Sequence, residues 1–313
     1  MPTVGSLSDL VGDKIPNDHA RQVHSRYYLR EVLTAPDAPD LMVDLGCGDG
    51  SSYGVAKGFR PDITWVGVDI LQSDPTLQLK DRRVVLYDGV KLPFRDNSVP
   101  MIYSNQVFEH VRYPELLLRE IKRVLEPGGV FVGSTSQLEP YHAWSLWNYT
   151  IYGFRVIVDD AGLVLDEVRP GIDGISLVQR QWFGRKPEFG KWFTVSPLNI
   201  EIDQVASARR TKPDARTTNL RKLQFAGHFS FRVRKPGAEP RFRPAVVAKA
   251  DYEPPQPIIP MAELGAPVPS AAPRVVMAVK MPPTSRQIMQ RRVRRVVRWA
   301  RKQARRAPIP GSR

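Results

Sequence analysis

Short apolar runs alternate with more polar stretches through the first half of the chain, and this alternation predicts the fold. The apolar runs are rich in valine and isoleucine, which is typical of strands buried on both faces of a sheet. They occupy residues 41–45, 64–70, 83–88, 101–105 and 129–136. Helices are predicted between such runs at 50–58 and 113–129, and the second has leucines at helical spacing. Strands that alternate with helices predict a doubly wound parallel sheet with right-handed crossovers.

The pattern loosens after residue 136 but still predicts further elements. Helices are expected at 151–162 and at 196–210, where a serine cap precedes a proline at the first helical position. Strands are expected at 163–170 and 225–235, and the alternation in the second of these predicts a late antiparallel strand.

A further helix is expected near the start of the chain, at residues 17–34, with Asn17 or Asp18 as its cap. The seven predicted strands then form an α/β domain of residues 1–235 with a mostly parallel, doubly wound sheet. Residues 137–154 and 171–224 are insertions within this domain.

Proline content and charge set the remaining residues apart from this domain. Residues 236–283 hold 12 prolines in 48 residues, which predicts a largely disordered linker. Residues 284–313 form a basic tail. Within it, residues 286–306 carry ten Lys or Arg around a stripe of apolar side chains at helical spacing, which predicts a basic amphipathic helix.

The net charge of +14 comes from this tail. After Glu263 the chain has 13 basic residues and no acid, so residues 1–263 hold 33 basic and 32 acidic residues, a net of +1. We favour binding of residues 284–306 to an anionic membrane surface over binding to nucleic acid. A solvated tail, or docking on an acidic partner, is the third interpretation.

The single cysteine excludes an internal disulfide framework and suits a reducing compartment. No signal peptide and no run of the roughly 18–20 apolar residues that a spanning helix needs are apparent. These features predict a cytoplasmic protein, with peripheral contact at the inner membrane face if the tail binds lipid.

The sequence VDLGCGDG at residues 43–50 is the main clue to a ligand. Glycines between a strand and a helix let a ligand lie against the backbone, and Asp69, 19 residues after Gly50, can accept ribose hydroxyls. A dinucleotide fits poorly, because Ser51 stands at the third glycine position and Asp44 and Asp49 would repel a pyrophosphate. A cationic adenosine compound, S-adenosylmethionine, fits better.

Five motifs in order resemble the class I S-adenosylmethionine-dependent methyltransferases, in particular their type 11 subgroup, over about residues 20–235. Besides VDLGCGDG these are VGVDI, YDGVKLPF, SNQVFEHV and LLREIKRVLEPGGVFVGS. The resemblance implies a Rossmann-like methyltransferase fold and S-adenosylmethionine as cofactor. It implies cofactor contacts at Asp44, Gly46, Cys47, Gly48, Gly50, Asp69, Ile70, Asp88, Gly89, Asn105 and Gln106.

The resemblance also implies roles for these residues. Asp44 would approach the cofactor's ammonium, Asp69 its ribose hydroxyls and Asp88 its adenine amino group. Asn105 and Gln106 would lie near the sulfonium. Cys47 is interpreted as a small side chain that fills a tight turn, and not as a nucleophile.

The methyl acceptor should bind after the fifth strand, at residues 137–154. Six of the 14 residues from 141 to 154 are aromatic, and rings interleaved with polar groups suit a sugar or another polyhydroxylated acceptor. The candidate acceptor-binding residues are Tyr141, Trp144, Trp147 and Tyr149. The alternative is that these rings pack a lid onto the sheet, and both can hold for different residues.

A hydroxyl acceptor needs a base that removes its proton. His142 is the first candidate and His110 the second, because imidazole accepts protons near neutral pH. Reactions without a histidine base stay open, and Glu109-His110 can instead orient the cofactor loop. The dispersed acids form no convincing metal-ligand cluster, so no required metal is expected.

The sequence therefore predicts O-methylation of a sugar or glycan intermediate. The SNQVFEH segment replaces the Asn/Asp-Pro-Pro-Tyr motif that positions planar amino groups in related families, which weakens an amide or nucleic-acid-base acceptor. One alternative is an N- or C-methyltransferase of a quinone or secondary metabolite. The other is a noncatalytic cofactor-fold module tethered to nucleic acid or a complex.

Overall fold

A computed structural model describes residues 6–70, 84–239 and 241–243. The expected linker beyond residue 243 and the expected basic helix at 284–313 lie outside the described residues. No helix in the described ranges is both long and apolar enough to cross a membrane.

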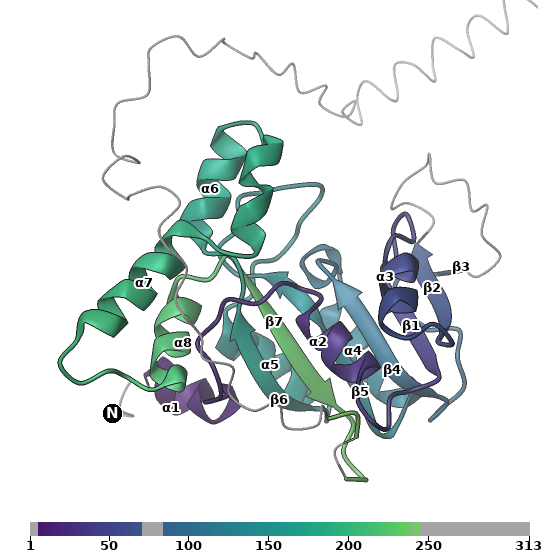
Figure 1. Cartoon of the computed structure of the whole chain (residues 1–313). Coiled ribbons are helices and arrows are strands. Elements are labelled where there is room, and N and C mark those ends of the chain that lie inside the picture. Colours follow the sequence, from purple (N-terminus) through teal and green to yellow (C-terminus); the bar gives the residue numbers. More distant parts are fainter. Residues whose placement is uncertain (1–5, 71–83, 240, 244–313) are drawn as a thin grey trace, which may run out of the picture. The chain divides into compact units, whose positions relative to one another are not determined.

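Seven strands of the described chain form one sheet in the order β3-β2-β1-β4-β5-β7-β6 (Figure 1). β7 runs antiparallel to β5 and β6, and the other neighbouring pairs among the first five strands are parallel. The predicted Rossmann-like fold with a late antiparallel strand is confirmed. The strands are β1 Leu41–Leu45, β2 Thr64–Ile70, β3 Val84–Tyr87, β4 Val99–Asn105, β5 Leu125–Ser136, β6 Val164–Pro170 and β7 His228–Arg234.

Helices cover both faces of the sheet because successive strand residues point to opposite sides. Val43 and Leu45 of β1 pack in a core with residues of α1, α4, α5 and α8, whereas Met42 packs with residues of α2 and α3. The helices are α1 Leu7–Val11, α2 Tyr27–Leu33, α3 Ser52–Phe59, α4 Pro114–Val124, α5 Ile151–Asp160, α6 Gly174–Trp182, α7 Pro197–Ala208 and α8 Ala215–Gln224, with short 3₁₀ helices η1 Gly12–Lys14, η2 Phe108–His110 and η3 Pro187–Phe193.

The boundary between α4 and β5 differs from the prediction. The helix expected to continue to residue 129 ends at Val124, and β5 begins at Leu125. Pro127 lacks an amide hydrogen and disfavours the helical conformation of the residue before it. Gly128 has φ +78° and donates its amide to the Lys235 carbonyl at 3.0 Å, so this segment joins the sheet early.

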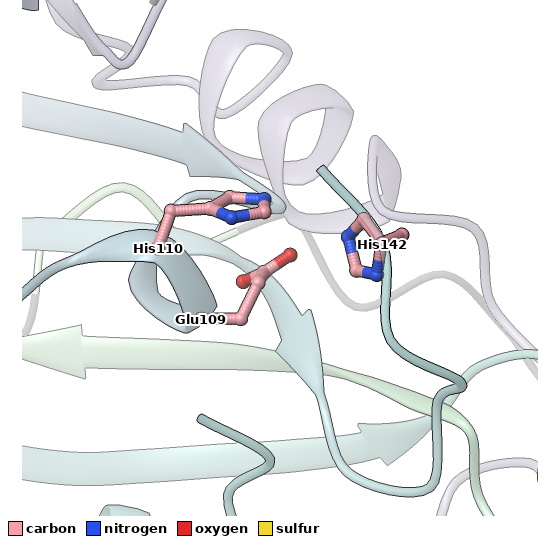
Figure 2. Close-up of side chains that lie close together, drawn as sticks. All are labelled: Glu109, His110 and His142. Atoms are coloured by element: carbon pink, nitrogen blue, oxygen red, sulfur yellow. The ribbon is translucent and has the colours of Figure 1, made fainter. Parts of the chain in front are cut away.

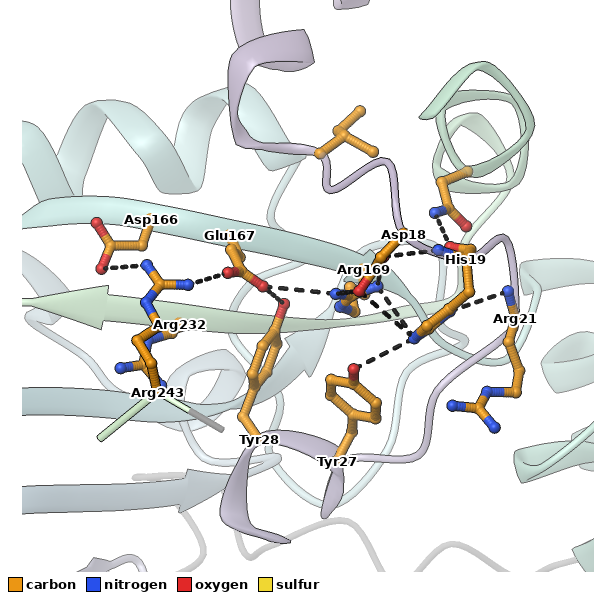
Figure 3. Close-up of polar contacts among 12 residues, drawn as sticks. Asp18, His19, Arg21, Tyr27, Tyr28, Asp166, Glu167, Arg169, Arg232 and Arg243 are labelled. Atoms are coloured by element: carbon orange, nitrogen blue, oxygen red, sulfur yellow. Dashed lines mark hydrogen bonds and ion pairs between the residues drawn. The ribbon is translucent and has the colours of Figure 1, made fainter. Parts of the chain in front are cut away.

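The helix expected at residues 17–34 is much shorter than predicted. α2 spans only Tyr27–Leu33, and Arg26 precedes it without a side-chain cap, so neither Asn17 nor Asp18 caps this helix. Contacts with distant parts of the chain hold the preceding residues in an irregular path instead (Figure 3).

Two of these contacts use groups that a helix would need for itself. Arg169 donates to both carboxylate oxygens of Asp18, at 2.9 and 2.7 Å. The Lys222 ammonium donates to the Ala20 carbonyl at 2.6 Å, which takes that acceptor away from a helical ladder. Helical propensity is a weak prior against such tertiary contacts.

The described domain continues a little beyond the expected boundary at residue 235. Phe242 is fully buried, and its amide donates to the Asp37 carboxylate at 2.9 Å. Arg232 in turn donates to the carbonyls of Arg241 and Phe242. Residues 241–243 therefore pack against the sheet, and a truncation should be placed after them.

Candidate active site

The glycine loop between β1 and α3 has a backbone conformation that residues with side chains rarely adopt. Gly46, Gly48 and Gly50 all have positive φ angles, of 72°, 51° and 74°. A Cβ atom at Gly46 would lie 2.4 Å from a methyl carbon of Val107, which follows β4. Glycine at this position therefore lets the loop approach the end of β4 closely.

Asp69 holds this loop from the end of the neighbouring strand. One of its carboxylate oxygens accepts the Gly48 amide at 2.7 Å, and the other accepts the Ile70 amide at 2.7 Å. The carboxylate is buried, yet neither contact brings a positive charge to it. Ile70, at the end of β2, is 38% exposed beside it.

Asp44 is a second buried acid at the end of β1. Its carboxylate accepts the Ser52 hydroxyl, and Ser52 accepts the indole N–H of Trp65 at 3.0 Å. Burial raises the pKa of Asp44 to about 7, and the charges of Asp69 and Asp49 add to the rise. Among the described residues no Lys or Arg pairs with Asp44, so the site favours a cation.

Asp88 and Gly89 form the turn after β3. Asp88 is exposed, and its Oδ1 accepts the amides of Val90 and Lys91 at 2.9 and 2.7 Å. These hydrogen bonds lower the pKa of Asp88, which keeps the carboxylate ionised. Gly89 has φ +86°, which completes the turn. The Oδ2 atom of Asp88 takes no part in either contact.

Cys47 fills space inside the glycine loop. Its side chain is buried, and burial raises the pKa of the thiol to about 12, with Asp44 and Asp69 adding to the rise. A Cβ atom at Gly67 would lie 2.8 Å from the Cys47 sulfur, so the loop is tightly packed against the middle of β2. A protonated, enclosed thiol is a poor nucleophile.

Asn105 and Gln106 follow β4, and serines of β5 hold both of them. The Ser134 hydroxyl donates to Asn105 Oδ1 at 2.9 Å, and Gln106 Nε2 donates to Ser134 at 3.0 Å. The Ser136 hydroxyl lies 3.1 Å from Gln106 Oε1 and also contacts Glu139. Gln106 has φ +54°, so the chain turns sharply at the end of the strand.

Glu109, His110 and His142 come together beside this turn (Figure 2). The rings of His110 and His142 meet edge to face with centroids 5.1 Å apart. Burial raises the pKa of Glu109 to about 7, whereas burial and the nearby His142 lower the pKa of His110. The structure thus joins both candidate bases in one cluster.

Two further side chains surround His142. Its Nδ1 lies 3.3 Å from the Pro140 carbonyl and 3.6 Å from Glu139 Oε1. His228 Nε2 lies 2.8 Å from Glu139 Oε2. Burial would raise the pKa of Glu139, but His228 and the Ser136 hydroxyl outweigh burial and lower it.

The four candidate aromatic residues fall into two groups. Tyr141 and Trp144 are 72% and 70% exposed, and Trp147 is half-exposed with its indole N–H on the Val111 carbonyl. Tyr149 is only 9% exposed and packs in the core, where its hydroxyl donates to the Phe108 carbonyl at 3.1 Å. The exposed rings are free to meet a ligand, while Tyr149 supports the fold.

Comparisons with known proteins agree with this geometry. The model of the type 11 methyltransferase domain family matches residues 43–133. This match covers the part of the sheet from β1 into β5, at residues 43–133. An uncharacterized methyltransferase of Mycobacterium leprae is 33% identical over 123 residues, 37% of this chain and 45% of that protein. The malonyl-[acyl-carrier protein] O-methyltransferase of a Marinomonas species is 27% identical over 141 residues, 42% of this chain and 51% of that protein.

The similarity covers only part of each protein. The chain spans 34%, 60% and 45% of the lengths of three curated relatives that it matches, from Streptomyces fradiae, Methanocaldococcus jannaschii and M. leprae. A solved S-adenosylmethionine-dependent methyltransferase from Mesorhizobium loti has a TM-score of 0.42 at 15% identity, covering 67% of this chain and 98% of that one.

The ends of β1 and β2 fit S-adenosylmethionine, the methyl donor of this methyltransferase domain. Its ammonium would balance the charge of Asp44, and its ribose hydroxyls would donate to Asp69. Neither carboxylate has a Lys or Arg partner in the described part of the chain. A Cβ atom at Gly48 would meet no atom within 4 Å, so the bare backbone leaves room for a ligand. The ends of these strands therefore place two buried carboxylates beside an open glycine loop.

Some residues of the methyltransferase domain's site were not predicted. Ser134 and Ser136 connect Asn105 and Gln106 to Glu139. The two serines alternate at the end of a predicted strand and so share one face of the sheet, which is a sequence signal for them. His228 contacts Glu139 from 89 residues further along the chain, and no local pattern points to that contact.

Proposed function

We propose that the protein transfers the methyl group of S-adenosylmethionine to a hydroxyl oxygen of a polyhydroxylated acceptor, such as a sugar or glycan intermediate. The observation that carries this proposal is one hydrogen-bonded series that starts at Asn105 and Gln106, beside the glycine loop. It runs through Ser134 and Ser136 to Glu139, next to His142. A base candidate is thereby fixed beside the cofactor end of the sheet.

When bound, S-adenosylmethionine supplies an activated methyl group on a sulfonium. The chain's own task is to hold the acceptor oxygen in line with the methyl carbon and the sulfur. Asp44 and Asp69 would bind the donor's charged and hydroxyl groups, and Asn105 and Gln106 would border the reacting end. The fixed side-chain network between β4 and β5 supports such alignment.

His142 is our first candidate for the group that takes the hydroxyl proton. Glu139 Oε1 lies 3.6 Å from its Nδ1, which is the arrangement in which a carboxylate orients an imidazole and stabilises its protonated form. His110 is the second candidate, because its ring meets that of His142. The two histidines serve one acceptor position.

The exposed rings of Tyr141 and Trp144 favour an acceptor with C–H faces and many hydroxyls. Aromatic faces stack on the apolar side of a sugar ring, and neighbouring polar groups such as Glu139 and Asn148 can bind its hydroxyls. The Marinomonas relative is named as an O-methyltransferase, which agrees with an oxygen acceptor.

A methyl-transfer assay with radioactive S-adenosylmethionine tests the function. The acceptor panel comprises sugars and glycan oligosaccharides, thiols and amines, each at the same concentration. We expect label in hydroxylated acceptors. Label found only in thiols or amines, or in no acceptor, would contradict the proposal.

A variant tests the role of His142. His142→Ala should lower turnover about 10²–10⁴-fold, the usual contribution of a general base, and leave cofactor affinity near wild type. His24→Ala is the matched control, because His24 is an exposed histidine outside this cluster. Equal losses in both variants would show that His142 has no special role.

We also propose that residues 284–306 bind an anionic membrane surface. The support is the sequence alone: ten basic residues, no acid, and an apolar stripe with Trp299 at its border. Each basic side chain near such a surface contributes roughly 1 kcal/mol, so removal of the residues after 243 should abolish flotation with anionic vesicles. Retardation of RNA without vesicle binding would replace this proposal with nucleic-acid binding.

A further inference from the structure

The Glu109–His110–His142 cluster has the composition of a metal site. One ligand atom from each of the three residues lies within 4.8 Å of the others. Glu109 and His110 belong to η2 after β4, and His142 belongs to the segment after β5 (Figure 2). Two separate loops therefore bring two imidazoles and one carboxylate to a single point.

Two of these ligand groups each have one buried polar atom without a hydrogen-bond partner among the described residues. Glu109 is fully buried, and although its Oε2 accepts the Thr135 hydroxyl at 2.9 Å, its Oε1 has no hydrogen bond among the described residues. The Nδ1 atom of His110 is also buried and lacks a hydrogen bond within the same ranges. Buried polar atoms of native proteins nearly always have partners, so these two atoms indicate a missing one.

His142 has the orientation that metal-bound histidines usually have. Its Nδ1 lies 3.3 Å from the Pro140 carbonyl, to which it can donate its ring hydrogen. That hydrogen bond selects the tautomer in which Nε2 keeps its lone pair. Metal-ligating histidines almost always donate their other ring N–H to a carbonyl or carboxylate in this way.

We propose that Glu109, His110 and His142 bind one divalent transition-metal ion, with Zn²⁺ as the best-fitting ion. Two imidazoles and one carboxylate are the protein ligands of many catalytic zinc sites, which keep a further position open. Imidazole nitrogens favour Zn²⁺ and other transition metals, whereas Mg²⁺ prefers oxygen ligands. Bond lengths of roughly 2.0–2.2 Å mean that the ion would draw the His142 loop slightly inward.

The role of this ion deepens the proposed function and rests on it. An ion here would bind the acceptor hydroxyl at its open position and lower the hydroxyl's pKa. The hydroxyl proton leaves to solvent, the oxygen forms its bond to the methyl carbon, and the sulfur keeps the electrons of the broken S–C bond. In the metal-bound protein His142 holds the ion in place of acting as the base, so the loss of turnover expected for His142→Ala then reports the loss of the ion.

Metal binding is measured without any methyl transfer, so its failure is separate from failure of the proposed function. Equilibrium dialysis of the full chain against Zn²⁺ should give one tightly held ion per chain. His142→Ala should weaken that affinity at least about 10-fold, as even the loss of a supporting group does in known sites. His24→Ala should bind Zn²⁺ as the unaltered protein does.

Co²⁺ provides a second measurement, because its visible absorption reports coordination by nitrogen and oxygen. The unaltered protein and His24→Ala should give the same Co²⁺ spectrum, and His142→Ala should lose it. Glu109→Gln removes the charge of the buried ligand and keeps nearly the same shape. If Glu109→Gln fails to fold, the Zn²⁺ affinity and Co²⁺ spectrum of His142→Ala alone test the metal site. Equal Zn²⁺ affinity in His142→Ala and the unaltered protein, or preference for Mg²⁺, would overturn the metal site.

Discussion

The molecule holds two groups of buried charge that differ in their pairing. At the ends of β1 and β2, Asp44 and Asp69 are buried without a Lys or Arg partner in the described ranges. At the β6–β7 edge, acids and arginines are paired. There Arg169 contacts Asp18 and Glu167, at 2.7 and 3.6 Å (Figure 3).

The paired group extends along the edge of the sheet. Arg234 lies 2.9 Å from Asp166, and Arg243 contacts both Asp166 and Glu167. The Tyr28 hydroxyl also donates a hydrogen bond to Glu167 Oε2 at 3.2 Å. These contacts fasten the first and last described segments to β6, so their charges serve the fold.

The difference shows how buried charge separates structural from functional sites. A buried charge is costly unless a partner offsets its desolvation. The acids at the β6–β7 edge have arginine partners within the chain, whereas Asp44 and Asp69 have no Lys or Arg partner in the described ranges. We therefore expect opposite changes in stability when Arg169 is removed from the paired group and when the charge of Asp44 is removed from the unpaired one.

Removal of Arg169 should have the largest effect. Its side chain is 4% exposed, and Arg169→Ala leaves Asp18 and Glu167 without that partner. Breaking a fully buried pair from one side typically costs about 3–5 kcal/mol; because the Asp18 side chain is 51% exposed, we expect a loss at the lower end of that range in the free energy of unfolding. Urea denaturation measures it, with Arg119→Ala on the exposed face of α4 as control. If Arg169→Ala lost no more unfolding free energy than Arg119→Ala, the β6–β7 charges would not stabilise the fold.

The same arginine gives this group its pH dependence. Burial would raise the pKa of Asp18, but the hydrogen bonds and charge of Arg169 outweigh burial and lower it to about 2. A depressed carboxyl pKa stabilises the fold above the unfolded value near 3.8, and that contribution disappears as the pH falls towards 2. Arg169→Ala should remove this part of the acid sensitivity.

Removal of the Asp44 charge should stabilise the ligand-free protein. Its folded pKa is about 7 against an ordinary 3.8, so the unfolded chain ionises first and stability falls as the pH rises between these values. Asp44→Asn should therefore gain up to about 4 kcal/mol over the unaltered protein at pH 8 and much less at pH 4. Denaturation at both pH values measures the gain. A stability gain of the same size at pH 8 and at pH 4 would contradict our inference that Asp44 is an unpaired buried acid.

The same substitution should weaken cofactor binding. An ammonium beside Asp44 favours its ionised form, so binding by the unaltered protein should release protons below pH 7 and tighten as the pH rises through 7. Calorimetry in two buffers of different ionisation enthalpy detects that release. Asp44→Asn should show neither the proton release nor the tightening.

The β1–β2 end was largely predictable from sequence, and the reason is local. The bounds of β1 and β2 match the predicted ones, because each apolar run lies between polar turn residues. The loop residues Gly46 and Gly48 and the strand-end residue Asp69 lie at fixed places relative to these strands. Their meeting therefore follows from the topology of a parallel sheet.

The β6–β7 edge was not predictable, because its contacts join distant parts of the chain. Residues 17–26 have a helical pattern, but Arg169 and Lys222, about 150 and 200 residues away, decide their path. The Glu139–His228 pair and the meeting of His142 with Glu109 have the same origin. Only the fold brings these side chains together, so the local sequence pattern does not predict their contacts.

Removal of Asp69 should weaken cofactor binding without a gain in stability. Asp69→Ala deletes the proposed ribose acceptor, which is also the anchor of the Gly48 amide. Hydrogen bonds to a charged group contribute about 1.5–3 kcal/mol, so the affinity for S-adenosylmethionine should fall by that amount. Calorimetry measures it, with exposed Asp62→Ala as control. Unchanged affinity in Asp69→Ala would remove this residue from the site.

The smallest expected effect is on stability, and it distinguishes the buried Tyr149 hydroxyl from the exposed Trp144 ring in the segment after β5. Tyr149→Phe removes only the hydroxyl that donates to the Phe108 carbonyl in the core. One such hydrogen bond contributes about 0.5–1.5 kcal/mol, so stability should fall by that amount while the KM for the acceptor stays the same. Trp144→Ala should do the reverse, because its ring is 70% exposed and supports no core packing. Denaturation and acceptor kinetics on both variants decide the matter: a raised KM in Tyr149→Phe with normal stability would place that hydroxyl in the acceptor site instead.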